Sequence, residues 1–199
     1  MHLERLKTNL EEAGFSFRFF PSSAQAADYL VQHLHGKTIG MGGSMTLEAM
    51  GLYPRLCETN TVFWHWKTPG PETLEQAARA QVYLTSLNAI AETGELINID
   101  GAGNRISAAT AAKEAVYFIV GKNKVETTFH KALWRARNIA APKNARRLHR
   151  NTSCAAGDSL QCYDCNSPER ICRGLSVWWQ PLLHVPFCQV ILIDEDLGF

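Results

Sequence analysis

Short, wholly apolar segments alternate with helical segments along most of this chain. The clearest apolar runs are residues 117–120 (YFIV) and 190–193 (VILI). Such runs are typical of strands in a parallel sheet, because helices bury both faces of that sheet. Further strands are expected at residues 82–86, 95–100 and 175–179. The pattern predicts an α/β fold with an open, mostly parallel sheet that carries helices on both faces.

Composition narrows the class of protein. The 199 residues are expected to form a single domain (1–199), and 20 Lys and Arg balance 19 Asp and Glu for a net charge of +1. This balance gives no reason to expect nucleic acid as a partner. The sequence contains no run of 18 apolar residues, so we expect no membrane-spanning helix. The N-terminal segment contains acidic residues and lacks the apolar core of a secretory leader. We therefore expect a cytoplasmic protein with reduced thiols.

Four cysteines gather in one polar stretch, residues 151–173, which we interpret as a cysteine-rich loop insertion. They are Cys154, Cys162, Cys165 and Cys172, with the spacing C-x7-C-x2-C-x6-C. Four thiolates can hold a zinc ion or an iron–sulfur cluster, and the C-x-x-C pair can chelate one metal without strain. The sequence does not separate zinc from iron–sulfur. A redox dithiol or disulfide, or no joint role, are the alternatives.

A glycine-rich loop follows the strand expected near residues 37–41. Its sequence is GMGGSMT, residues 40–46. Glycines let the backbone bend and approach a ligand closely, and hydroxyls add hydrogen bonds. The residues expected to contact a ligand are Gly40, Gly42, Gly43, Ser44 and Thr46. An ordinary strand-to-helix turn is the alternative, because the loop lacks the Lys of a Walker motif.

Residues 88–105 offer a second candidate site. Glu92 precedes Thr93 and Gly94 at a turn between two strands, where a carboxylate could act as a base or nucleophile. A second turn contains Gly101, Gly103 and Asn104 and could hold a polar ligand. Turn chemistry alone explains the same residue types.

Basic and aromatic residues have simpler interpretations. Most of the Lys and Arg residues after position 121, including Lys122 and Lys124, are expected on solvated surfaces. The tryptophans at 64, 66, 178 and 179 are more typical of core or interface than of ligand stacking. No zinc-hydrolase histidine motif is present.

Three segments together resemble the LUD domain family of lactate-utilisation proteins. They are residues 42–52 (GGSMTLEAMGL), 91–96 (AETGEL) and 100–105 (DGAGNR). Residues 138–148 and 164–173 resemble the short, stand-alone branch of the family. The similarity spans about residues 3–194. It implies an open α/β sandwich similar to the NagB/RpiA/CoA-transferase group, and a role beside iron–sulfur subunits that oxidise L-lactate to pyruvate.

The same resemblance bears on Glu92. In the CoA-transferase relatives a glutamate in a similar E-x-G turn is the nucleophile, and Glu92 stands at the matching position. The chain has Glu-Thr-Gly where those enzymes have Glu-Asn-Gly.

Our leading interpretation is an accessory or electron-transfer component of the oxidation of L-lactate or a related hydroxy acid. It would bind a small anionic metabolite and contact iron–sulfur partner subunits or a second copy of itself as a homodimer. Two alternatives stay open. One is a transferase or isomerase that uses Glu92, and the other is a metal- or redox-sensing binding module.

Overall fold

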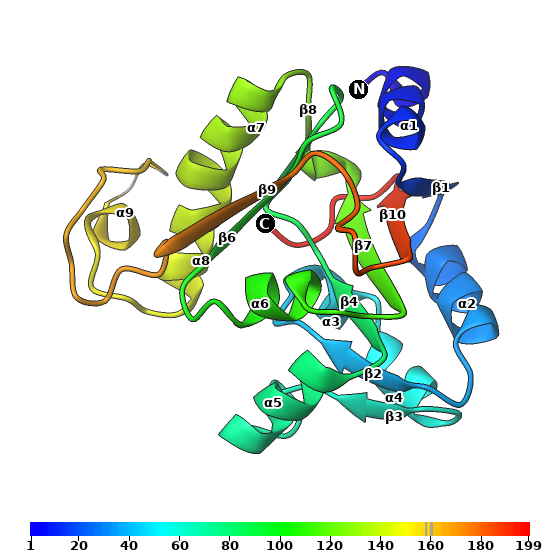
Figure 1. The fold of residues 1–199 in the computed structure, drawn as a ribbon. Coiled ribbons are helices and arrows are strands. Elements are labelled where there is room, and N and C mark those ends of the chain that lie inside the picture. Colours follow the sequence, from blue (N-terminus) through cyan, green and yellow to red (C-terminus); the bar gives the residue numbers. More distant parts are fainter. Residues whose placement is uncertain (158, 160) are drawn as a thin grey trace.

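Six parallel strands form the central sheet of the computed structural model, which describes residues 1–157, 159 and 161–199 (Figure 1). The strand order is β1-β10-β7-β4-β2-β3, and all five neighbouring pairs are parallel. The strands are β1 (Ser16–Phe20), β2 (Thr38–Met41), β3 (Thr61–Phe63), β4 (Val82–Thr85), β7 (Ala115–Gly121) and β10 (Phe187–Ile193). β7 and β10 contain the two apolar runs and pair along seven residues. The predicted α/β fold class is confirmed.

One helix precedes β1, and the others lie in the connections between the strands. They are α1 (Leu3–Glu12), α2 (Ser23–His33), α3 (Met45–Ala49), α4 (Leu52–Cys57), α5 (Pro71–Arg79), α6 (Asn104–Thr110), α7 (Phe129–Arg135), α8 (Ala141–Arg147) and α9 (Ser153–Ala156), with a 3₁₀ turn η1 (Lys122–Lys124) and a π-helical turn η2 (Ala136–Ala140). None of the helices in the described part of the chain is long and apolar enough to cross a membrane.

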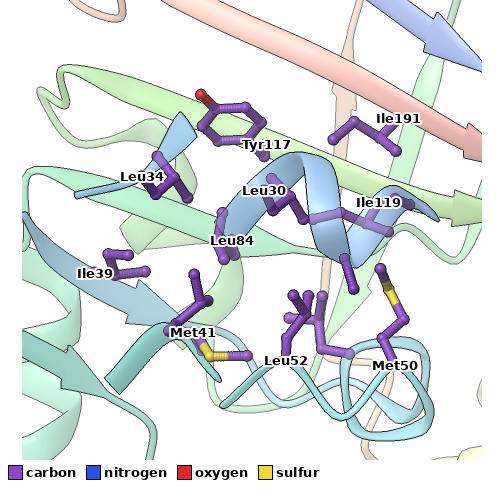
Figure 2. Close-up of a cluster of buried hydrophobic side chains, with 14 of the residues drawn as sticks. Leu30, Leu34, Ile39, Met41, Met50, Leu52, Leu84, Tyr117, Ile119 and Ile191 are labelled. Atoms are coloured by element: carbon purple, nitrogen blue, oxygen red, sulfur yellow. The ribbon is translucent and has the colours of Figure 1, made fainter. Parts of the chain in front are cut away.

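One face of the parallel sheet packs against α2, α3 and α4 (Figure 2). Leu30 of α2 and Leu52 of α4 meet Leu84 of β4 and Ile119 of β7 there, and all four side chains are fully buried. Alternate residues of the central strands point to this face and to the opposite one. Every residue of β4 and β7 is therefore buried, since both faces of these strands are covered.

A second, four-stranded sheet covers much of the opposite face together with α1 and α6. Its order is β8-β5-β6-β9, formed by β5 (Ala89–Ala91), β6 (Leu96–Asp100), β8 (Val125–Glu126) and β9 (Gly174–Trp178). The β5–β6 and β6–β9 pairs are antiparallel, and α7 packs on the outer side of this sheet. The sequence predicted strands near β6 and β9 but no separate sheet, because every residue of β6 is buried and resembles a parallel strand.

Replacement of Leu30 by Ala should leave a cavity between α2 and the sheet. We expect the free energy of unfolding to fall by about 2–5 kcal/mol, the usual range for a buried leucine. Leu183→Ala is the matched control, because its side chain is 99 % exposed. Denaturant unfolding of both variants measures the difference. Equal stability of the two variants would contradict this description of the core.

Candidate functional site

A cavity of about 560 Å³ lies where the parallel strands end. Four successive strand ends contribute to its wall: Gly43 and Ser44 after β2, His65 and Trp66 after β3, Ser86 and Asn88 after β4, and Lys124 after β7. Open parallel sheets bind ligands at this edge, because the loops that follow neighbouring strands converge there. The cavity is therefore the candidate functional site.

The glycine-rich loop forms part of this wall, and its glycines are needed for close packing. A Cβ at Gly42 would lie 2.9 Å from the hydroxyl oxygens of Tyr83 and Thr85, and one at Gly43 would lie 2.8 Å from Nε1 of Trp66. Ser44 lines the cavity and also begins α3, where its hydroxyl accepts a hydrogen bond from the amide of Leu47. Gly40 instead lets the backbone of α5 approach β2 at Ala77, so it serves packing.

The turn after β6 faces the same cavity. Gly101 and Asn104 line it, whereas Gly103 takes a left-handed conformation with φ of 78° at the start of α6. The carboxylate of Asp100 accepts hydrogen bonds from the amides of Ala102 and Arg105, which fixes the turn. The structure thus brings together two segments that the sequence suggested separately.

Lys124 is the most deeply buried charged group in the cavity wall, with 3 % of its surface exposed. Its Nζ donates hydrogen bonds to Thr46 Oγ1 at 2.8 Å and to Ser86 Oγ at 2.9 Å. Burial, and then the charges of Arg135 and Arg105, hold the pKa of Lys124 well below its usual range. Thr46 therefore acts in the site through Lys124.

The cavity wall carries an excess of positive charge. Six of its residues are Lys or Arg and only two are Asp or Glu; they are Arg105, Lys124, Arg147, Arg150, Arg170, Arg173, Asp100 and Glu169. The guanidinium of Arg147 also lies 5.0 Å from the ring centre of Trp66. An anionic ligand is favoured by such a wall, and Arg in particular matches carboxylate geometry.

His65 adds a titratable group to this wall. Burial lowers the pKa of His65, Asp100 acts in the opposite direction, and Arg105 lowers it again. Its buried Nδ1 has no hydrogen-bond partner within the described part of the protein. The lowered pKa favours the neutral imidazole, and its buried Nδ1 is an unpartnered polar atom beside the cavity.

Glu92 lies elsewhere, beneath the start of α1. Its Oε1 accepts a hydrogen bond from the backbone amide of His2 at 2.7 Å, and its own carbonyl accepts one from Asn9 Nδ2. Arg5 is 4.0 Å from Oε2. Glu92 is not part of the cavity wall, and neither are Thr93 and Gly94 beside it. These surroundings favour a structural role, in which Glu92 ties α1 to the β5–β6 turn.

The four loop cysteines line one small cavity of about 20 Å³, beside Arg137 and Arg170. Arg170 Nε donates to Cys172 Sγ at 3.2 Å, and Arg137 approaches Cys162 Sγ at 3.7 Å. All four thiols are free. Among residues 1–157, 159 and 161–199, no three His, Cys, Asp or Glu side chains converge closely enough to hold a metal ion. The metal site therefore stays a prediction.

The cysteine-rich segment also reaches the main cavity. A Cβ on Gly101 would lie 2.7 Å from the carbonyl oxygen of Ile171, so the loop backbone rests directly on the turn after β6. Pro168, Glu169 and Arg173 complete that side of the wall.

Sequence reasoning missed Lys124, Arg105 and His65 as site residues. Lys124 lies three residues after the strand that ends at Gly121, and this position near a carboxyl end was the available signal. Arg105 and His65 carried no comparable signal, because their place in the wall depends on contacts between distant segments.

Glu92→Ala should weaken α1 without changing the main cavity. The part-buried hydrogen bond from the His2 amide is lost, so we expect the free energy of unfolding to fall by about 1 kcal/mol. Glu12→Ala on the exposed surface of the same helix is the control. Hydrogen exchange within α1, measured beside ligand binding, checks this. Unchanged exchange with lost binding would instead favour a catalytic Glu92.

Comparisons with known proteins agree with this architecture. The family model of the LUD domain matches residues 3–177. No curated protein is significantly similar to the chain. A solved structure of a DUF162 family protein from Deinococcus radiodurans is similar, with a TM-score of 0.58, 14 % sequence identity and coverage of 96 % of this chain and 95 % of that one. This likeness shows a shared fold, and the family match confirms the resemblance drawn from the sequence. The chain belongs to the LUD domain family.

Proposed function

We propose that this protein is an accessory or electron-transfer component in the oxidation of L-lactate or a related 2-hydroxy acid. Membership of the LUD domain family supports a lactate-utilisation type of protein in general. The specific proposal is that a small anionic metabolite binds in the 560 Å³ cavity at the strand ends.

The observation that carries this proposal is the charge of the cavity wall. Four arginines line this space: Arg105, Arg147, Arg150 and Arg173. The carboxylate of Asp100 also lines it but already accepts hydrogen bonds from the turn after β6. A carboxylate placed there gains charge-assisted hydrogen bonds from guanidinium groups. The same group relieves the mutual repulsion of the cations, so a 2-hydroxy or 2-oxo acid fits this wall better than a neutral metabolite.

The size of the cavity supports a role with a second reactant. A volume of about 560 Å³ exceeds the needs of a three-carbon acid and lies in the range of pockets that hold much larger ligands. An electron acceptor or a segment of a partner subunit could occupy the remaining space.

Arg105→Ala should weaken the binding of lactate and pyruvate about tenfold, which corresponds to about 1.4 kcal/mol. Isothermal titration calorimetry at fixed ionic strength measures the loss, and thermal unfolding verifies that the variant folds. Arg79→Ala is the control, because Arg79 lies on the exposed surface of α5, outside the cavity wall, and pairs with Glu75. Wild-type affinity in the Arg105 variant, or an equal loss in both variants, would contradict an anion site in this cavity.

The electron-transfer part of the proposal is tested by reconstitution. With its iron–sulfur partner subunits the protein should support lactate-dependent reduction of a dye. Activity that is the same with and without this chain would count against any role in the oxidation.

We also propose that the cysteine-rich loop binds a metal ion or an iron–sulfur cluster. All four cysteines line the same 20 Å³ cavity, and Arg170 Nε donates a hydrogen bond to the sulfur of Cys172. This volume suits a single ion. A cluster requires the loop to open, since metal binding and local ordering are coupled.

Cys165→Ser should remove most of the metal bound per chain. The protein is purified without oxygen, and iron, zinc and acid-labile sulfide are measured. Cys57→Ser is the control, because Cys57 is an exposed free cysteine at the end of α4. Iron matched by sulfide indicates a cluster, and zinc alone indicates a structural site. Equal metal content in the two variants would contradict the proposal.

A further inference from the structure

We infer that Lys124 forms a covalent imine with the carbonyl carbon of a 2-oxo acid held in the main cavity. The inference rests on the proposed function, because it needs an anionic metabolite in the same site. It goes further by giving the protein a reactive group and by defining the substrate class through a carbonyl next to a carboxylate.

The hydrogen bonds of Lys124 match a neutral amine. Thr46 donates its hydroxyl proton to the carbonyl oxygen of Leu197 at 3.1 Å, and Ser86 can donate its proton to Thr46 Oγ1 at 3.3 Å. Both hydroxyl oxygens are then acceptors for Lys124 Nζ. Two acceptors satisfy the two N–H bonds of a neutral amine and leave its lone pair free.

The surroundings of Lys124 disfavour its charged form. Its two partners are hydroxyls, and within the described part of the chain no carboxylate lies within 4.0 Å of Nζ. Nearby Lys122 differs, since its ammonium is exposed and pairs with Asp194 at 3.2 Å. Burial and the charges of Arg135 and Arg105 lower the pKa of Lys124, so the amine is available as a nucleophile.

The chemistry needs no further reactant. The Nζ lone pair attacks the carbonyl carbon, and the carbon–oxygen π bond breaks to give a carbinolamine. That carbon then loses its oxygen as water, which takes both hydrogens of the amine, and a carbon–nitrogen double bond remains. Neutral amine and 2-oxo acid thus give imine and water, and no electrons are gained or lost.

The charge of the wall selects the acid. A carboxylate next to the carbonyl can pair with the guanidinium groups of Arg105 or Arg147, which line the same cavity as Lys124. A 2-hydroxy acid shares this carboxylate but has no carbonyl. Lactate should therefore bind without forming an adduct, and its oxidation product should react.

Reductive trapping tests this inference. The full-length protein is incubated with pyruvate and sodium cyanoborohydride, and the intact mass and the modified peptide are determined. We expect one reduced adduct per chain, located at Lys124, and none with lactate. Lys124→Met should reduce the adduct to the level seen without pyruvate. Methionine has a similar volume and no charge, and the hydroxyls of Thr46 and Ser86 can still bond to each other.

Two other lysines control for general reactivity. Lys122 is exposed, and Lys113 is buried outside the cavity with a pKa that burial also lowers. Adducts at either lysine that equal those at Lys124 would overturn the inference. So would an adduct with dihydroxyacetone phosphate in place of pyruvate, since a phosphorylated ketone would then be the substrate class.

The outcomes also separate this inference from the proposed function. If pyruvate and lactate bind by calorimetry but no adduct is trapped, the covalent step is wrong and the anion site remains. If neither acid binds, the proposed function is wrong, and the inference about Lys124 fails with it.

Discussion

The parallel direction of the strands in the central sheet is the constraint on which the rest of the structure depends. Because β2, β3, β4 and β7 run in the same direction, the four loops that follow them meet at one edge. The backbone must then pass closely among side chains, and Gly42 and Gly43 allow this where a Cβ would clash. The cavity is a direct result of this topology, and its chemistry depends on which side chains the loops place there.

Much of the fold could be predicted from the sequence, because local patterns such as the apolar run at residues 117–120 indicate where the buried strands lie. The glycine-rich loop could be located for the same reason. The site could be predicted only in part. Glu92 occurs in a turn that resembles a catalytic one, yet α1 covers it through the amide of His2. Lys124, by contrast, was not among the predicted site residues but lies in the cavity wall. Its partner Thr46 lies 78 residues earlier, and no local motif connects the two.

The buried basic side chains of the site have an energetic consequence. Arg135 is buried and donates to the carbonyl oxygens of Asn123 and Asn88, so it holds together the loops after β7 and β4. Lys124 lies beside it without a carboxylate partner. An apolar residue at position 124, in the turn η1, would avoid the cost of burying an amine. Proteins retain such unfavourable groups mainly where function needs them, and a ligand that carries negative charge would stabilise the folded state.

The contact between Gly101 and Ile171 joins two parts of the chain that differ in chemistry. Residues 168–173 are at once the end of the cysteine-rich segment and one wall of the main cavity. Because the Ile171 carbonyl lies so close to Gly101 that a Cβ there would clash, a shift of the backbone at Ile171 would change that wall. If the thiols bind a metal or change their oxidation state as proposed, that change would alter the shape of the cavity in which we propose that a metabolite binds.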